Sequence, residues 1–443
     1  MSSRSQWGSR LGFILASAGS AVGLGAIWKF PYLAGANGGS AFILPYVLIA
    51  FTVGLGLMMA EMALGRAGRG GIVETFRRIG GKPWAFGGFL AVLVGFLILS
   101  FYSVVGGWTV AYFIGAVTGS GLSPNLADLK ASFGAFVGDG ATLIAYHGVF
   151  MLMTAVVVGT GVQSGIERLS KWLMPTLFVL MALLIVRGLT LPGAMAGVEY
   201  LFYPAWEKFT INALFDAMGF TFFSLSLGMG AMVIYGSYLD DKANLPSSAA
   251  WVVLLAVGTA LLGGLMVLPP VFAFGLDPAA GPGLTFITMP AVFSQMPFGQ
   301  LFAIMFYACL IVAALTSSVS LLEVVSSYFA EEMKISRRTA AWGSAIAMFL
   351  TGIPCALSFG MMSDVKIFGR NFFDLFDYIS SNLLMPIGGI LVAVLAGWVA
   401  WPKMALQFGA VRSGQHPGWL PMARIIIAVV APLTVGIVMV NGL

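Results

Sequence analysis

Apolar residues recur along the chain in long runs that short polar connectors separate. Eleven of these runs approach the length of about 20 residues that a helix needs to cross a bilayer. They cover residues 10–35, 39–65, 84–118, 141–161, 166–187, 211–238, 247–275, 298–330, 338–356, 371–399 and 421–441. Hydrophobic residues make up 59% of the 443 positions, and only 9% are charged. Water-soluble domains carry about 25% charged residues, so the pattern predicts an all-α integral membrane protein with 11 transmembrane helices.

Basic residues are distributed unevenly among the connectors. With a cytoplasmic N-terminus, sixteen of the 22 Lys and Arg residues fall on the cytoplasmic side, as the positive-inside rule requires. The odd number of spans then places the C-terminus outside. The first run stays apolar as far as Leu33. That length exceeds a signal peptide, so we expect a retained span.

Glycines interrupt two of the spans. Gly19, Gly23 and Gly25 lie within seven residues of the first span, and Gly228 and Gly230 lie in the sixth. Each Gly lowers helix stability by roughly 1 kcal/mol relative to Ala, and peptide groups freed at membrane depth must face protein or a polar cavity. Matching interruptions in two halves are typical of inverted-repeat transporters. The alternative is a glycine-rich face for helix packing. We predict that spans one and six are unwound at the midplane.

Catalytic signatures are missing from the sequence. It contains no HExxH motif, no P-loop and no Ser/His/Asp grouping. His147 and His416 are too far apart to suggest a metal site, and Cys309 and Cys355 fall in apolar runs. The basic balance follows from membrane topology and does not indicate nucleic acid. We predict that the protein is not an enzyme.

Several short motifs resemble the neurotransmitter:sodium symporter family. In chain order they are WGSRLG from Trp7, AVGLG from Ala21, FP from Phe30, NGG from Asn37, ALGR from Ala63, SLSLG from Ser224, TMP from Thr288 with FSQ from Phe293, and LTSS from Leu315. The similarity extends from Trp7 to about Trp401. It implies one transporter domain, 1–443, with a LeuT-type 5+5 inverted repeat: repeat one about 10–187, repeat two about 211–399, and an extra helix at 421–441. It also implies sodium-driven uptake of an amino acid or amine by alternating access.

The resemblance implies a substrate site at the two interruptions. The backbone N–H groups of Leu24 and Gly25 and the hydroxyl of Tyr102 would bind a carboxylate. Relatives that transport amines carry Asp where this chain has Gly23, so we expect an amino acid. The remaining residues expected at the site are Ala21, Ile98, Val105, Phe223, Ser224, Ser226, Met229, Ser317 and Leu321. Because these carry no fixed charge, we expect a neutral side chain, hydrophobic or aromatic.

The resemblance also implies sodium sites. The family's second site (Na2) corresponds to the carbonyls of Gly19, Val22 and Ala313 and the hydroxyls of Thr316 and Ser317. Neutral oxygens suit a hard cation, although such hydroxyls also bond back to their own helix. At the first site (Na1), Ala21 and Ser224 are retained, but the family's two amides are replaced by Ala26 and by Leu255 or Ala256. An undercoordinated buried ion is costly, so we predict one sodium ion per substrate.

Gates are implied on both sides of the membrane. Lys29 and Asp377 would close the outer side, and Arg4, Glu331 and Trp7 the inner side. Chloride is not predicted. Tyr46 and Ser224 match the family's chloride position, but Phe220 replaces an amide, and span seven carries no acid.

The expected partners are the amino acid and the lipid of a bacterial inner membrane, with the protein a monomer or homodimer. Two alternatives remain open. One is a proton-coupled amino acid transporter that uses Glu61 or Lys29. The other is a non-transporting amino-acid sensor of the same fold. A channel would need a continuous polar pore, whereas the polar residues cluster at one depth.

Overall fold

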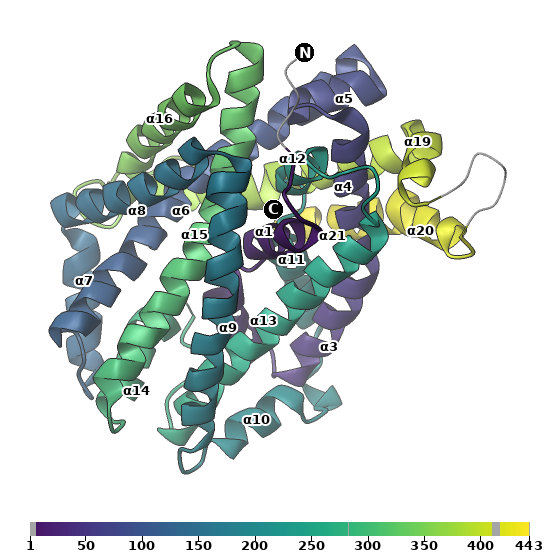
Figure 1. Ribbon diagram of the computed structural model, residues 1–443. Coiled ribbons are helices and arrows are strands. Elements are labelled where there is room, and N and C mark those ends of the chain that lie inside the picture. The colour runs from purple at the N-terminus through teal and green to yellow at the C-terminus, as the bar shows by residue number, and fades with distance from the viewer. Residues whose placement is uncertain (1–5, 282, 410–416, 443) are drawn as a thin grey trace.

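A computed structural model describes residues 6–281, 283–409 and 417–442. Within these ranges the regular elements are helices, and the one strand-like contact is an isolated bridge between Ile367 and Arg370 (Figure 1). The α-helices are α1 Arg10–Ala21, α2 Phe30–Ala36, α3 Ser40–Ile49, α4 Leu55–Gly68, α5 Ile72–Gly80, α6 Ala85–Thr118, α7 Leu126–Gly138, α8 Gly140–Thr160, α9 Arg168–Leu189, α10 Met195–Phe202, α11 Ile211–Ser224, α12 Ala231–Ser237, α13 Leu245–Ala273, α14 Met289–Ser294, α15 Gly299–Glu332, α16 Arg337–Leu357, α17 Phe372–Asp377, α18 Met385–Val394, α19 Trp401–Gln407, α20 Leu420–Ile425 and α21 Ala431–Gly442.

Nine helical stretches of the described chain are long and apolar enough to cross a membrane. They are Ser40–Gly68, Lys82–Thr118, Gly140–Thr160, Val162–Leu189, Leu245–Ala273, Gly299–Glu332, Arg337–Leu357, Phe372–Val399 and Leu420–Gly442. A tenth span results if Arg10–Ala21 and Gly25–Ala36, which meet at a bend of 50°, are one span. The sixth predicted span is divided between α11 and α12, with 14 and 7 residues. The total of eleven spans therefore stays a prediction.

Both glycine-rich interruptions break their helices, as predicted. The first break separates α1 from a π-helical turn, Gly25–Lys29, and the second separates α11 from α12. Gly228 and Gly230 have φ of +79° and +80° there, and Ser226 has φ of +53°. A left-handed serine is unfavourable, but its Oγ donates to the carbonyl of Ser20 at 2.9 Å. This bond joins the two broken spans directly.

The broken spans are held by straight helices. α15 packs against α6, and both lie in the centre of the molecule (Figure 1). α12 packs against α4 so closely that a Cβ at Gly65 would come within 1.9 Å of the Val233 carbonyl oxygen. A Cβ at Gly236 would come within 2.4 Å of the Met62 carbonyl oxygen. Glycines at these two positions therefore fix the second half of span six to span two.

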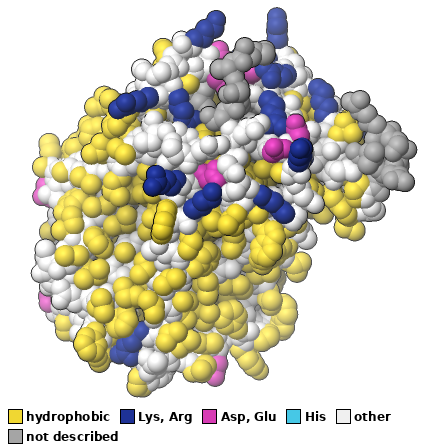
Figure 2. Space-filling model, in the orientation of Figure 1, with side chains coloured by type: hydrophobic (Ala, Val, Ile, Leu, Met, Phe, Trp, Pro, Cys, Tyr) yellow, Lys and Arg dark blue, Asp and Glu magenta, His cyan; other side chains and the backbone are white. Residues whose placement is uncertain are grey.

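Charged side chains gather at one end of the molecule. Figure 2 shows Lys and Arg side chains over one end of the face drawn, above a broad hydrophobic surface. This distribution is typical of a multi-pass membrane protein. The assignment of the N-terminus to the cytoplasm stays a prediction, as does the placement of the C-terminus outside.

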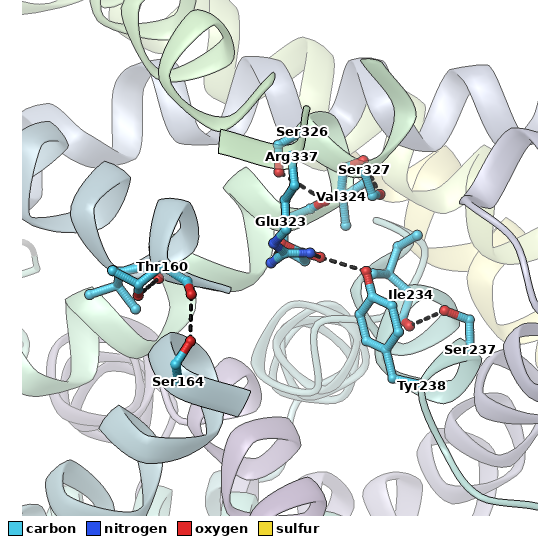
Figure 3. Close-up of polar contacts among 11 residues, drawn as sticks. Thr160, Ser164, Ile234, Ser237, Tyr238, Glu323, Val324, Ser326, Ser327 and Arg337 are labelled. Atoms are coloured by element: carbon cyan, nitrogen blue, oxygen red, sulfur yellow. Dashed lines mark hydrogen bonds and ion pairs between the residues drawn. The ribbon is translucent and has the colours of Figure 1, made fainter. Parts of the chain in front are cut away.

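A buried ion pair ties together three helices at the charged end. Glu323 of α15 is fully buried and faces Arg337 of α16, with N–O distances of 2.6 Å and 2.5 Å. The hydroxyl of Tyr238, just after α12, donates to the same carboxylate at 2.6 Å (Figure 3). The sequence placed these residues in or beside apolar spans without indicating that they meet.

Arg337→Met is expected to destabilise the protein by about 3 kcal/mol, because it leaves a buried carboxylate without its cation. This is the lower end of the usual range, since the Arg337 side chain keeps 28% exposure and water reaches part of the pair. Unfolding by SDS in mixed micelles measures the change. Adding Glu323→Gln should restore most of the loss. A double variant no more stable than Arg337→Met would contradict this explanation.

Candidate functional site

A small cavity lies where the two broken spans meet. Its lining residues are Ser20, Ala21, Gly23, Leu24, Gly25, Ile98, Tyr102, Phe223, Ser224, Ser226, Met229, Ser317, Ser320 and Leu321. Eleven of the twelve residues predicted for the substrate site are among them. Val105 is the exception and lines a wider vestibule one turn further along α6. Ser20, Gly23 and Ser320 line the cavity and were not predicted there, although Ser20 and Gly23 lie in the glycine-rich stretch of span one noted in the sequence.

The cavity is far smaller than the vestibule. The cavity has about 30 Å³ of free space, roughly enough for one water molecule. The vestibule has about 350 Å³ and is lined by aromatic rings together with Lys29, Asp374 and Asp377. Tyr102 and Phe223 line both spaces. These two side chains therefore stand between the vestibule and the cavity.

The first break offers hydrogen-bond donors to the cavity. The backbone N–H of Leu24 donates to the hydroxyl of Tyr102 at 3.2 Å, which leaves the phenolic proton for another acceptor. At Gly23, a Cβ would come within 2.6 Å of the Ser317 Oγ and 3.2 Å of the Tyr102 hydroxyl. Ser317 and Tyr102 therefore leave no room for a side chain at Gly23, and the backbone itself lines the cavity there. Such donors suit an anionic group.

Of the five residues predicted for Na2, Gly19 of α1 contacts Thr316 and Ser317 of α15. All five are buried. A Cβ at Gly19 would come within 3.1 Å of the Thr316 Cβ, so the two helices are in close contact. The Ser317 hydroxyl donates to the carbonyls of Ser20 at 2.9 Å or Gly19 at 3.3 Å, and Thr316 bonds back to Val312 and Ala313 at 3.1 Å. A hydroxyl that donates its proton keeps its oxygen lone pairs available to a cation. The arrangement can offer neutral oxygens from two helices to a cation.

The region predicted to have lost Na1 is filled by backbone packing. Ala26 is buried against α13, where a Cβ at Gly263 would come within 2.2 Å of the Ala26 carbonyl oxygen. The hydroxyl of Ser224 bonds back to Thr221 at 3.3 Å. Ala26, Leu255 and Ala256 bring no side-chain oxygen.

The position that corresponds to chloride in the family is rich in aromatic rings. Tyr46 packs against Phe220 with ring centroids 5.0 Å apart. The buried Tyr46 hydroxyl has no hydrogen-bond partner among the described residues. Thr259, the nearest hydroxyl on span seven, bonds back to Leu255 at 2.7 Å.

The expected outer gate residues line the vestibule without pairing. No ion pair joins Lys29 to Asp377 in the part of the chain that the structure describes. The Lys29 ammonium lies 4.9 Å from the centre of the Phe223 ring. The Asp377 carboxylate accepts a hydrogen bond from Ser381 at 2.8 Å.

The expected inner gate residues lie beyond the other side of the cavity. The indole N–H of Trp7 donates to the Tyr235 carbonyl at 3.0 Å, and its ring packs edge-on against Tyr235 and Tyr238. Glu331 accepts from the backbone N–H of Gly71 at 2.6 Å. Arg4 lies outside the described residues. Trp7 thus packs directly on the end of span six.

Glu61 supports the break of span six. It is fully buried on α4, and its Oε1 accepts from the Gly228 N–H at 2.7 Å. Its other oxygen, Oε2, has no hydrogen-bond partner in the described structure. This carboxyl group is therefore only half satisfied.

Comparisons with known proteins agree with this architecture. The model of the sodium:neurotransmitter symporter family matches residues 4–122 and 139–443. An uncharacterized sodium-dependent transporter of Bacillus subtilis (strain 168), YhdH, is 41% identical over 98% of this chain and 97% of its own. Another from Haemophilus influenzae is 34% identical over 89% of both chains. The crystal structure of MhsT in complex with L-phenylalanine is 38% identical and matches with a TM-score of 0.91 over 100% of both chains.

The match to MhsT confirms the predicted all-α LeuT-type fold. The family match extends over both broken spans and the cavity between them. Its proteins are transporters rather than enzymes, in agreement with the prediction from the sequence. This chain belongs to the sodium:neurotransmitter symporter family.

Proposed function

We propose that this protein is a sodium-coupled symporter that imports a neutral amino acid with a hydrophobic or aromatic side chain. The observation that carries the proposal is the cavity between the two broken spans. It brings the peptide groups of the first break, the Tyr102 hydroxyl and apolar walls together in one small space. No ionisable acid or base lines it apart from the tyrosine.

The chemistry of the cavity lining suits an amino acid that supplies its own charges, and the site would have to widen to admit it. Its carboxylate would bind the N–H groups of Leu24 and Gly25 and the Tyr102 hydroxyl. The ammonium group would face main-chain carbonyls at the breaks, since Gly23 provides no acid. Ile98, Met229 and Leu321 would surround the side chain, and a flexible Met can adapt to different shapes. The similarity to MhsT, which was crystallised with L-phenylalanine, supports an aromatic or hydrophobic substrate.

Sodium at Na2 would couple ion binding to movement. α1 belongs to repeat one and α15 to repeat two, so an ion bound between them would favour the arrangement in which its ligands converge. The packing of Gly263 on Ala26 supports the loss of Na1. We therefore propose that one sodium ion accompanies each amino acid and that chloride is not required.

The transport cycle follows from the positions of the gates. The amino acid and sodium would enter through the vestibule past Tyr102 and Phe223. Lys29 and Asp377 would then approach each other, directly or through water, because Lys is a point charge without the fork of Arg. Inward release would require Trp7 to separate from the end of span six and the expected pair of Arg4 and Glu331 to open.

A second candidate is proton-coupled transport through Glu61. The unpartnered Oε2 of this buried carboxyl favours it, because a protonated carboxyl could donate to a neighbour when span six changes shape. Sodium coupling remains the stronger proposal, since the curated relatives are named as sodium-dependent transporters.

Uptake into proteoliposomes with independently imposed sodium and pH gradients tests the proposal. We expect radiolabelled phenylalanine or leucine to accumulate with an inward sodium gradient and not with a pH gradient alone. The reversal potential should correspond to one sodium ion per amino acid. A reversal potential for two ions would refute the loss of Na1, and accumulation driven by pH would favour Glu61. Binding without accumulation would identify a sensor.

Thr316→Val is expected to raise the sodium concentration for half-maximal uptake by about tenfold, equivalent to about 1.4 kcal/mol. The substitution removes one proposed sodium ligand at almost constant volume. Thr52→Val is the matched control, because Thr52 bonds back to its own helix at 2.6 Å and is exposed, away from the cavity. Equal sodium dependence in the two variants would contradict the assignment of Na2.

A further inference from the structure

We propose that Glu167 clamps the inner end of span one against the start of span five, and that this clamp opens when the transporter opens inward. Glu167 ends the π-helical turn Val162–Glu167 that precedes α9, and only 2% of it is exposed. Its Oε2 accepts from the Gly8 N–H at 2.6 Å, and its Oε1 accepts from the Ser9 hydroxyl at 3.0 Å. The Lys171 ammonium lies 2.7 Å from Oε1.

These contacts complete the beginning of α1. The first N–H groups of a helix have no partners within it. Ser9 is the N-cap residue, and its Oγ accepts a hydrogen bond from the Gly12 N–H at 3.0 Å. The same hydroxyl donates a hydrogen bond to Glu167. A carboxylate is also favoured at the positive end of a helix. Glu167 therefore stabilises α1 only while α1 lies against span five.

Gly12 leaves the space on α1 that the Glu167 side chain occupies. A Cβ at Gly12 would come within 2.1 Å of the Glu167 Oε1. The carboxylate thus lies across the first turn of α1, in space that any larger residue would fill. Beside it, the Gln163 amide donates to the Gln6 carbonyl at 2.6 Å. The two segments are joined at several points around one buried acid.

The clamp can control the proposed sodium site because the short helix α1 connects Glu167 at its start to Gly19 near its end. The helix runs over 12 residues from Arg10 to Ala21 and carries Gly19. Moving its inner end away from span five would move the Gly19 carbonyl away from Thr316. Glu167 is thus a positioning residue that acts through α1, and this role rests on the alternating-access function proposed above.

Removing the carboxylate should favour inward-open states in a way that can be measured directly. Ser17 of α1 is 0% exposed, and its hydroxyl has no partner among the described residues. Ser17→Cys is therefore a mild change that reports when α1 swings out. The reporter requires Cys309→Ala and Cys355→Ala, and labelling uses a membrane-impermeant maleimide on inside-out vesicles in sodium.

Glu167→Ala should increase the labelling rate by about fivefold or more, the effect expected from losing one helix cap. Glu167→Gln should show a smaller increase, because its amide oxygen can still accept from Gly8. The matched control is Glu74→Ala, which removes a partly exposed acid that pairs with Arg77 and Arg78. Its labelling should stay within about twofold of the parent, as for other surface changes.

Labelling of Glu167→Ala and Glu167→Gln at the parental rate would overturn the clamp. An equal increase in Lys171→Gln would also overturn it, because that change keeps the bonds to Gly8 and Ser9. Should Glu167→Ala not fold, as judged by size-exclusion chromatography, Glu167→Gln alone decides between these results. Labelling needs no substrate, so failure of the parent to accumulate amino acids would refute the proposed function and leave the clamp result to stand separately.

Discussion

Peptide groups freed inside an apolar span must find partners within the protein, and this requirement governs the centre of the molecule. The N–H of Leu24 bonds to Tyr102 on span three, and the N–H of Gly228 bonds to Glu61 on span two. The carbonyl of Ser20 accepts from the hydroxyl of Ser226. Each break is thus held by neighbouring helices, and the groups that satisfy the breaks also lie in or beside the cavity. Stability and the proposed binding chemistry depend on the same bonds.

Buried acids hold the broken spans at three points. Glu61 contacts the break of span six, Glu323 bonds to Tyr238 just after α12, and Glu167 bonds to Gly8 and Ser9 at the start of α1. α12 is fixed further by the glycine contacts with α4, where two backbones touch. α1 meets α15 largely through hydroxyls, such as the bond between Ser20 and Ser320 at 2.7 Å. Polar contacts of this kind can exchange for ions or water, so we infer that α1 moves more readily than α12.

The sequence predicted the features that depend on local chemistry. Glycine weakens a helix wherever it stands, so both breaks could be placed without a structure. The cavity residues followed from the motifs that resemble the family. Val105 shows the limit of that reasoning, because it shares a helix face with Tyr102 but lies one turn further along and lines the vestibule instead.

Contacts between distant segments could not be predicted in this way. Glu167 and Gly8 are 159 positions apart, and nothing local to either residue names its partner. Glu323 and Arg337 are only 14 positions apart, but they belong to different helices whose relative placement the sequence does not give. Burial of these acids could be anticipated from their apolar surroundings. Their partners depend on how the helices pack.

The contact between Ala26 and Gly263 bears on where ion-dependent movement can occur. A sodium ion bound among spans one, six and seven would need ligands with space to converge on it. Here the Ala26 carbonyl lies against the backbone of α13, where only glycine leaves room. This direct packing joins spans one and seven. In the proposed cycle, the junction of α1 with α15 then remains as the place where one ion would alter the contact between the two expected repeats, and this junction lies on the helix that Glu167 holds.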